Sequence, residues 1–278
     1  MSRTPMQFFE AISAIPRVSG NEKAVADFVE QLALAKGYEV RRDAMHNMVV
    51  VRPASPGCEH CDTFMMQGHL DMVAAAKEGV THNFDTDPIE LVRDGDLLRA
   101  NGTTLGADDG VAVAYMLAIL EDDSVVAPRL ECVFTVQEEV GCRGAVTAAN
   151  RLNPGWAIVL EGTTAADLPG VEPGKEVCRV GEGIVIPFMD RGTIYSRRVY
   201  EMVTSLAEKN GIPWQTKQLI AGGTDASAIQ RSGEGVYVVT MAAPLRNIHS
   251  PASVGKISDL ELLPVLCRHL LEEIANGY

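Results

Sequence analysis

The feature that most constrains the fold is an alternation of short apolar runs with segments of helical periodicity. The short runs are typical of buried strands, and the segments between them place apolar residues three or four positions apart. Strands that are separated by helices indicate a mainly parallel sheet covered by helices on both faces. We therefore predict an α/β fold, and one domain is the simplest organisation for a chain of 278 residues.

The pattern gives approximate bounds for each element. The expected strands are Met48–Val51, Phe64–Gln67, Leu130–Val136, Trp156–Leu160 and Val236–Met241. The expected helices are Phe8–Ile15, Val25–Leu32, Val113–Leu120, Ala145–Arg151, Ser196–Lys209 and Ile257–Ile274. Ser19 and Glu22 have the spacing of a capping box ahead of the second helix, and Gly37 is placed to end that helix.

Charge and hydropathy argue against several classes of function. The formal net charge of −13 and the pI near 4.9 argue against nucleic-acid binding, because neutralising phosphates requires a basic face. No apolar run approaches the ~18–20 residues that span a bilayer. The first residues lack the apolar core and the small-residue cleavage site of a secretory signal. We expect a soluble, cytoplasmic protein that binds neither nucleic acid nor membranes.

Residues of metal-binding and acid–base type stand at the ends of the expected strands or just beyond them. They are His69, Asp71, Asp108, Glu138, Glu139, Glu161 and His249. Ligands of open α/β sheets bind outside the carboxyl ends of the strands, so we expect these side chains to meet there. Neighbours that leave a strand point in different directions, so Glu138 and Glu139 can take different roles. A Glu-Glu pair alone is more often a solvated surface feature, but the whole series favours a catalytic site.

The series contains the ligands for two metal ions. Two ions ~3.5–4 Å apart need a bridging carboxylate and further ligands for each ion. Asp108 is the natural bridge, because it lies in a glycine-rich turn that lets the backbone bend sharply. His69 and Glu161 can complete one ion, and Glu139 and His249 the other. Imidazole and carboxylate ligands without thiolate suit zinc, and also cobalt or manganese.

Two acidic residues remain for roles beside the metal ions. A metal-bound imidazole commonly donates its other N–H to a carboxylate, and we expect Asp71 to orient His69 in this way. Glu138 is then free to act as a general base that takes a proton from a metal-activated water and passes it to the leaving amine. Together these residues predict metal-assisted hydrolysis of an amide bond.

Motifs in the right order along nearly the whole chain resemble the co-catalytic dizinc exopeptidases, specifically the glutamyl-aminopeptidase (TET) family. In the second half the motifs are Thr135–Gly141, Arg143–Ala145, Leu160–Thr163, Gly222–Ala226 and Leu245–Pro251. The first half is more similar to tripeptidase T and the aminoacyl-histidine dipeptidases, through Ile15–Glu22, Gly68–Asp71 and Gly102–Asp109. The resemblance implies a three-layer α/β/α zinc-peptidase fold with a central mixed, mainly parallel sheet. It also implies a cis peptide after the bridging aspartate, here Asp108–Asp109.

Two features depart from the family pattern. The family carries an assembly insertion between the motifs of Asp71 and Asp108, where this chain has only about 35 residues, fewer than a domain needs. The stretch from Glu161 to His249 is already filled by expected elements, which leaves no room for an inserted lid. We expect a single catalytic domain over residues 1–278 that forms a monomer or a small homo-oligomer. Glu161 is the second departure, since the related aminopeptidases usually have aspartate there.

The leading interpretation is a metal-dependent exopeptidase that removes N-terminal residues from short peptides. Glu161 motivates an alternative, because related enzymes that cleave from the carboxyl end or remove acyl groups often have glutamate at this place. That alternative is a carboxypeptidase, dipeptidase or N-acyl-amino-acid hydrolase. A second alternative is a non-catalytic metal-binding protein, and the intact set of ligands with Glu138 argues against it.

Other polar residues have open or structural interpretations. Four histidines lack a motif and are expected at the surface or at helix ends: His46, His60, His82 and His269. Cys58 and Cys61 have the spacing of a metal-binding pair, but no second pair exists to complete four ligands, so we expect a polar turn. Thr224 and Asp225 either line the substrate pocket or rigidify a loop. Arg246 either meets a substrate carboxylate or pairs with a local acid.

Overall fold

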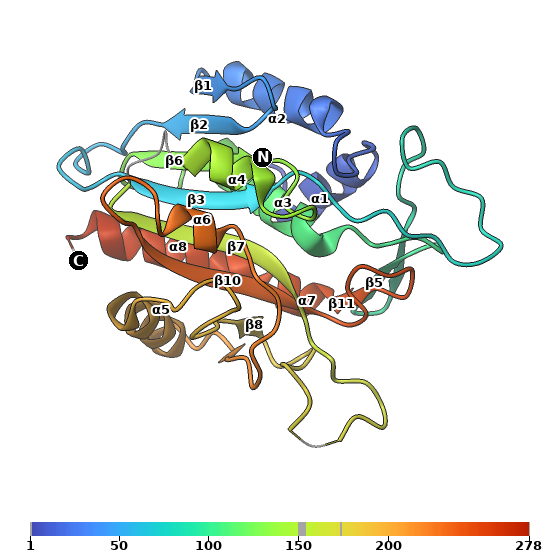
Figure 1. The fold of residues 1–278 in the computed structure, drawn as a ribbon. Coiled ribbons are helices and arrows are strands. Elements are labelled where there is room, and N and C mark those ends of the chain that lie inside the picture. The colour runs from blue at the N-terminus through green and yellow to red at the C-terminus, as the bar shows by residue number, and fades with distance from the viewer. Residues whose placement is uncertain (1, 150–153, 173, 278) are drawn as a thin grey trace.

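The computed structural model describes residues 2–149, 154–172 and 174–277. Its largest feature is an eight-stranded sheet in the order β1-β2-β6-β3-β7-β10-β8-β9 (Figure 1). The strands are β1 (Glu39–Arg42), β2 (Met48–Arg52), β3 (Phe64–His69), β6 (Leu130–Thr135), β7 (Trp156–Thr164), β8 (Ile184–Val185), β9 (Trp214–Gln215) and β10 (Tyr237–Leu245). The central strands β6, β3, β7 and β10 are parallel, whereas β2 and β8 pair antiparallel to them at either side.

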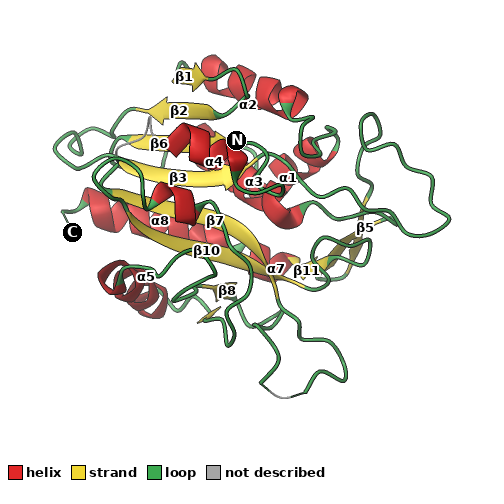
Figure 2. Ribbon diagram, in the orientation of Figure 1, coloured by secondary structure: helices red, strands yellow, loops and turns green. Residues whose placement is uncertain are grey.

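Helices cover both faces of this sheet (Figure 2). One face packs against α1 (Pro5–Ser13), α2 (Lys23–Ala35), α3 (Ala107–Glu121), α5 (Arg197–Lys209) and α8 (Leu262–Ala275). The other face carries α4 (Arg143–Ala148) and α6 (Ala226–Ile229). The predicted three-layer α/β/α architecture with a mixed, mainly parallel sheet is therefore confirmed. Among the described residues, no helix is both long enough and apolar enough to cross a membrane.

Neighbouring side chains of the central strands enter different cores. Met65 packs with residues of α6, whereas Met66 packs with the larger cluster beneath α1 and α3. Successive side chains of a strand point to opposite faces, and here both faces are buried. This is why β3 and β6 lack the polar alternation of a strand with one face in water.

A second, antiparallel sheet ties two distant segments of the chain together. It consists of β4 (Leu91–Asp94), β5 (Leu97–Ala100) and β11 (Val254–Lys256), with β5 in the centre. The backbone N–H of Ile257 also donates to the carbonyl oxygen of Asp96 at 2.8 Å. Figure 1 shows this sheet at the side of the molecule, where the long segment between β3 and α3 returns. The loop after β10 is thereby fastened to the segment that leads into α3.

Several element bounds differ from those expected. Strand β7 continues to Thr164, so Glu161 lies inside a strand and not at its end. Helix α3 begins at Ala107, which places Asp108 in its first turn, where the backbone angles of Asp108 and Asp109 are not helical. The predicted final helix is divided at Glu261 into α7 (Ile257–Leu260) and α8. The end of the predicted helix Ala145–Arg151 lies outside the described residues.

The predicted capping box at Ser19 and Glu22 is wrong. Glu22 is the N-cap residue of α2 but forms no capping hydrogen bond there, and the Ser19 hydroxyl instead donates to Asp71 Oδ2 at 2.7 Å. A capping box opens α1 instead, where Thr4 Oγ1 accepts from the Gln7 N–H at 3.2 Å and Gln7 Oε1 accepts from the Thr4 N–H at 2.8 Å. Gly37, with φ of +77°, follows the end of α2 as expected.

Candidate metal centre

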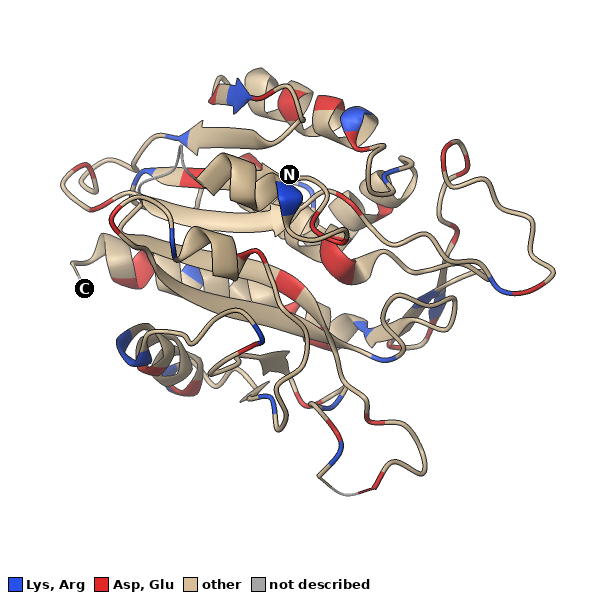
Figure 3. Cartoon of the chain, in the orientation of Figure 1, with Lys and Arg blue, Asp and Glu red and all other residues tan. Residues whose placement is uncertain are grey.

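The predicted site residues all meet beside the carboxyl ends of the four parallel strands. His69 ends β3 and Asp71 follows it, Glu138 and Glu139 follow β6, Glu161 lies in β7, His249 follows β10, and Asp108 lies in the first turn of α3. The parallel direction of the central strands explains this meeting, because it brings their carboxyl ends to one edge of the sheet. Figure 3 shows acidic positions of α3 and β7 near this edge.

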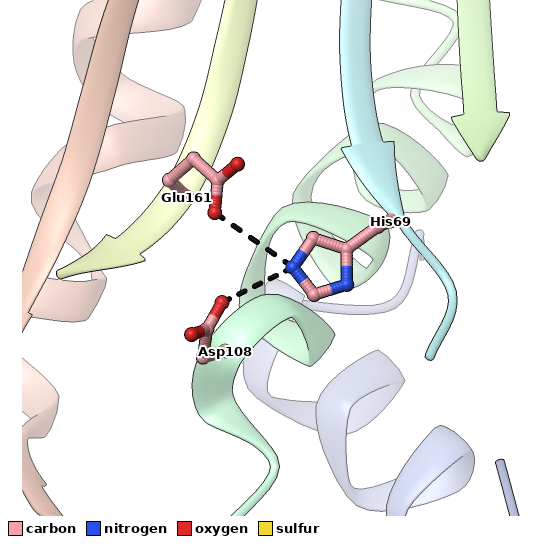
Figure 4. A group of neighbouring side chains, drawn as sticks. All are labelled: His69, Asp108 and Glu161. Carbon is pink, nitrogen blue, oxygen red and sulfur yellow. Dashed lines mark hydrogen bonds and ion pairs between the residues drawn. The ribbon is translucent and has the colours of Figure 1, made fainter. Parts of the chain in front are cut away.

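Two groups of side chains share the carboxylate of Asp108. In the first group, His69 Nε2 lies 3.2 Å from Asp108 Oδ1 and 3.7 Å from Glu161 Oε2 (Figure 4). In the second group, His249 Nε2 lies 3.0 Å from Asp108 Oδ2 and 3.1 Å from Glu139 Oε2. Each group could hold a metal ion, since its ligand atoms lie within 4.8 Å of one another. The two oxygens of Asp108 thus serve different groups.

The carboxylates of the site favour positive charge on the two imidazoles. Hydrogen bonds to Asp108 and Glu139 raise the pKa of His249 to about 10. Burial opposes the charged form of His69, but hydrogen bonds to Asp108 and Asp71 raise its pKa well above the ordinary value. Burial also opposes the charged form of Asp108, yet the hydrogen bonds from His249 and His69 lower its pKa. The two groups together therefore form an environment that stabilises cations.

Buried oxygen atoms of the site fit divalent cations. Among the described residues, Glu139 Oε1 and Glu161 Oε1 are buried without a hydrogen-bond partner. Burial raises the pKa of Glu161 well above the ordinary value, and the charge of Asp109 adds to this effect. A buried carboxylate oxygen without a partner is unfavourable, and a coordinated cation removes the penalty. Imidazole nitrogens and carboxylate oxygens are ligands of zinc, cobalt and manganese.

Asp71 connects His69 to the loop that carries the two glutamates. His69 Nδ1 lies 3.1 Å from the carbonyl oxygen of Asp71 and 3.4 Å from its Oδ1. The backbone N–H groups of Glu138 and Glu139 donate to Oδ1 and Oδ2 of Asp71, at 3.0 and 3.3 Å. The buried carboxylate of Asp71 thus contacts both the imidazole of His69, at the end of β3, and the backbone that follows β6.

Glu138 belongs to neither of the two groups that share Asp108. It lines the same cavity as Asp108, Glu139 and Glu161. Its Oε1 accepts a hydrogen bond from the Cys142 thiol at 3.2 Å. Burial raises the pKa of Glu138 to about 7. A carboxyl group with a pKa near neutrality can both take up and release a proton at pH 7.

Two of the open residue assignments acquire a structural interpretation. Asp225 is fully buried and accepts hydrogen bonds from Gln67 Nε2 at 2.8 Å and Thr135 Oγ1 at 2.7 Å, so it fixes its loop to β3 and β6. Arg246 forms a two-pronged ion pair with Asp167, at 2.9 Å from Nε and 2.7 Å from Nη2. Thr224 lines the cavity beside the two groups.

The four histidines without a motif lie outside both groups. His46 Nδ1 contacts the Arg42 guanidinium at 3.0 Å, and His269 Nδ1 lies 3.6 Å from Glu272. The segment of Cys58 and Cys61 forms a turn in which the Cys61 N–H donates to the Cys58 carbonyl at 3.1 Å. The expectation of a polar turn there is confirmed.

Arg17 is a structural residue of the site that sequence reasoning did not single out. Its buried guanidinium donates to the carbonyl oxygens of Leu70 at 3.0 Å and Asp71 at 3.2 Å, and to that of Gly106. Burial lowers its pKa to about 10, so it remains charged at neutral pH. The only available signal was its position inside the motif Ile15–Glu22. Arg17 joins the segment after β3 to the turn before Asp108.

The peptide bond between Asp108 and Asp109 is cis, as the family resemblance implies. Asp109 binds the backbone next to it, since its Oδ2 accepts a hydrogen bond from the backbone N–H of His69 at 3.0 Å. The two adjacent aspartates therefore occupy different environments, one shared by the two imidazoles and one buried beneath β3.

Known proteins resemble this chain in sequence and in fold. The cytosol non-specific dipeptidase of Escherichia coli K12 is 40% identical over 137 residues, which are 49% of this chain and 28% of that protein. Other curated aminopeptidases that the chain matches are likewise covered over less than half of their length. An aminopeptidase of Desulfurococcus kamchatkensis has a TM-score of 0.82 and 25% identity, over 97% of this chain and 95% of that one.

The fold is also shared with an assembling peptidase. The TET1 peptidase of Pyrococcus horikoshii, which can assemble into a tetrahedron or a large octahedral shell, has a TM-score of 0.75 and 21% identity, over 96% of this chain and 99% of that one. Residues 86–266 match the family described as M42 glutamyl aminopeptidase, and this segment contains both groups except His69. Because the match covers more than half of the chain, the protein belongs to the M42 glutamyl aminopeptidase family.

Proposed function

We propose that the protein is a metal-dependent aminopeptidase that removes N-terminal residues from short peptides. The observation that carries the proposal is the position of Asp108, whose two oxygens face two imidazoles from opposite groups. Glu138 stands beside these groups in the same cavity without belonging to them. Family membership supports the proposal, as do relatives described as aminopeptidases and as a dipeptidase.

Five residues would hold two divalent ions. His69, Asp108 and Glu161 would hold one ion, and Asp108, Glu139 and His249 the other. We propose zinc, with cobalt or manganese as substitutes, because the ligands are imidazole and carboxylate groups. When bound, the ions supply polarisation of the peptide carbonyl and acidification of water.

The chain's own residues supply the proton transfer. Glu138 acts as the general base, taking a proton from the attacking water and delivering it to the nitrogen of the leaving amine. Its half-buried carboxyl group, with a pKa of about 7, suits both steps at neutral pH. Asp71 holds the imidazole of His69 and the backbone of Glu138 in one arrangement. A fixed arrangement of base and ligands lowers the reorganisation that the reaction requires.

Cleavage of dipeptides, of C-terminal residues or of N-acyl groups is the second candidate function. Glu161 favours it, because enzymes of the resembled group that cleave from the carboxyl end or remove acyl groups often have glutamate at this place. Its carboxylate lies 3.7 Å from His69 Nε2 within the first group. The similarity to the Escherichia coli dipeptidase points the same way. Both candidate functions use the same metal ligands and the same base.

We further propose that the chain acts as one catalytic domain and forms a monomer or a small oligomer. Between β3 and α3 the structure has loops and the strands β4 and β5, which pair with β11 in the small sheet. Light scattering on the full chain tests the proposal. A particle of about twelve subunits, like the assemblies formed by related peptidases, would contradict it.

A matched pair of substrates tests which end of a peptide is cleaved. The protein, stripped with a chelator and reloaded with Zn²⁺, is given a leucine anilide with a free amine and an N-acetylated dipeptide with a free carboxylate. The proposed aminopeptidase cleaves the first, and only after metal is restored. Cleavage of the second alone would establish the carboxypeptidase or acylase function instead, and cleavage of neither would favour a non-catalytic metal-binding protein.

A further inference from the structure

Cys142 lies next to the carboxylate that serves as the base in the proposed function. Its thiol donates a hydrogen bond to Glu138 Oε1 at 3.2 Å. Among the side chains that the structure describes, that of Cys142 alone forms a hydrogen bond with the Glu138 carboxylate. Cys142 is not one of the described residues that line the cavity, and it belongs to neither of the two groups that share Asp108. An effect of this thiol on the reaction would therefore act through Glu138.

The backbone of Glu138 and its carboxylate are held by different partners. Asp71 Oδ1 accepts the backbone N–H of Glu138 at 3.0 Å. That contact does not fix the side-chain torsions of the glutamate, and ordering such a side chain costs conformational entropy. The neighbouring Glu139 differs, because its carboxylate faces His249 at 3.1 Å. The hydrogen bond from Cys142 is thus the described contact that orients the carboxylate of the base.

A closed turn holds the thiol beside this carboxylate. The backbone N–H groups of Gly141 and Cys142 both donate to the carbonyl oxygen of Glu138, at 2.9 and 2.8 Å. Cys142 has φ of +52° and is the N-cap residue of α4. This helix packs closely against the end of β6, since a methyl group on Gly144 would overlap the carbonyl oxygen of Val136. The backbone therefore fixes where the side chains of residues 138 and 142 meet.

The thiol has one proton to donate and two carboxylates near it. Burial, and the charges of Glu138 and Asp225, raise the pKa of Cys142, so the thiol keeps its proton. Oxygens of both carboxylates lie within 4.8 Å of the sulfur. Asp225 Oδ2 already accepts from Gln67 and Thr135, at 2.8 and 2.7 Å, whereas the hydrogen bond of the thiol goes to Glu138. Asp225 Oδ1, which is buried without a partner, is the alternative acceptor.

We propose that Cys142 is a positioning residue that orients the carboxylate of Glu138 for proton transfer. The proposal rests on the proposed function, in which Glu138 takes a proton from the attacking water. A base that is already oriented requires less reorganisation during the reaction. In this assignment the thiol neither binds metal nor touches the substrate. Its removal should therefore lower kcat and leave KM and the metal content unchanged.

Three variants test the assignment in zinc-loaded protein, with whichever of the two substrates above is cleaved. Cys142→Ala removes the donor, whereas Cys142→Ser retains one as a hydroxyl. Cys267→Ala is the matched control, because Cys267 is a thiol buried in α8 within the apolar core. Cys142→Ala should lower kcat by about 3- to 10-fold, as expected for loss of one hydrogen bond. Cys142→Ser should retain most of the wild-type kcat, and Cys267→Ala all of it.

A double-mutant cycle separates positioning of Glu138 from a general structural role. Glu138→Ala leaves no carboxylate to orient, so adding Cys142→Ala to it should not lower the residual kcat any further. An equal loss in both backgrounds would overturn the proposal and would point to Asp225 as the acceptor of the thiol. An unchanged kcat in Cys142→Ala would also overturn it. A loss of metal from Cys142→Ala would do so as well, because the thiol would then be a ligand.

A structural measurement distinguishes failure of this inference from failure of the proposed function. Crystal structures of the zinc-loaded wild type, Cys142→Ala and Cys142→Ser are determined under the same conditions. The Glu138 carboxylate should occupy one position in the wild type and in Cys142→Ser, and a different position or several positions in Cys142→Ala. This outcome supports the orienting role of the thiol even if the wild type cleaves neither substrate. An unchanged carboxylate in Cys142→Ala rejects that role.

Discussion

A methyl group on Gly162 would lie 2.8 Å from the Cβ of Asp108, closer than two such carbons ever approach. The same methyl group would lie 2.9 Å from Leu245 Cδ1 on the neighbouring strand β10. The first turn of α3 can therefore approach β7 only because position 162 has no side chain. This approach places Asp108 next to Glu161, the residue before the glycine.

Gly162→Ala should displace Asp108 from its position between the two histidines. We expect a loss of metal content and of peptidase activity with the fold retained, because the clash is confined to Asp108 and the end of the Leu245 side chain. Metal analysis after dialysis and circular dichroism provide the two measurements. Gly155→Ala, just before β7, is the matched control, since a methyl group there meets nothing closer than Asp62 Oδ2 at 4.0 Å. Equal metal content in both variants would contradict the expected effect.

The two adjacent glutamates should give opposite phenotypes. Glu138→Gln should retain its metal and lose about 10²- to 10⁴-fold in kcat, as expected for removal of a positioned general base. Glu139→Gln should lose metal, because its carboxylate faces His249 at 3.1 Å within the second group. Metal analysis together with kcat at saturating Zn²⁺ separates the two outcomes. Swapped phenotypes, or a fully active Glu138→Gln, would refute the assigned roles.

Asp71→Asn should weaken metal binding without removing a ligand. Both oxygens of the Asp71 carboxylate accept backbone hydrogen bonds from the loop of Glu138 and Glu139, and an amide offers only one acceptor. We expect metal affinity or kcat to fall by about 10- to 100-fold, the range found for partners of metal-binding histidines. Competition with a zinc chelator measures the affinity. Ser19→Ala, which removes only the hydroxyl that donates to Asp71 Oδ2, should have a smaller effect, and a larger one would contradict this explanation.

The fold and the composition of the site could be predicted because their signals are local. Buried parallel strands are continuous apolar runs, and their carboxyl ends converge, so residues such as His69 and Glu138 could be brought together without coordinates. The sequence pattern predicts ends for β7 and β10 that are too early, because it follows only apolar runs. The small and polar residues from Glu161 to Thr164 do not continue the apolar run, yet they pair in register with β10 up to Leu245.

Features that depend on contacts between distant segments could not be predicted. Ser19 has the local pattern of a helix cap, but its hydroxyl donates to Asp71 instead. The Asp71 carboxylate is buried and is already held by the backbone N–H of Glu138, so it is the better acceptor. The short strands β8 and β9 carry no periodic signal and exist through pairing with β10 and with each other. Lys217 likewise lies in a segment without a motif, and only the fold places it in the cavity that Asp108 and Glu161 also line.

Arg17→Met should destabilise the protein and loosen the site at the same time. The guanidinium satisfies the carbonyl oxygens of Leu70, Asp71 and Gly106, which methionine cannot do. The carbonyl oxygens of Asp71 and Gly106 keep His69 Nδ1 at 3.1 Å and the Gly110 N–H at 3.0 Å, whereas that of Leu70 loses its donor. A buried acceptor left without a donor costs ~1–3 kcal/mol, so the free energy of unfolding should fall by about that amount. Urea denaturation in the presence of a chelator measures this without a contribution from bound metal.

The control for this prediction is a second arginine whose ion pair lies near the surface. Arg268 pairs with Asp122 and its side chain is 41% exposed, so Arg268→Met should cost no more than about 1 kcal/mol. Arg17→Lys should fall between the two, because an ammonium keeps the charge but cannot reach three carbonyls in the planar geometry of a guanidinium. Arg17 spans the segment after His69 and the turn before Asp108, so Arg17→Met should also lower metal affinity, whereas Arg268→Met should not. Equal losses of stability in the two methionine variants would show that the buried guanidinium does not hold these segments together.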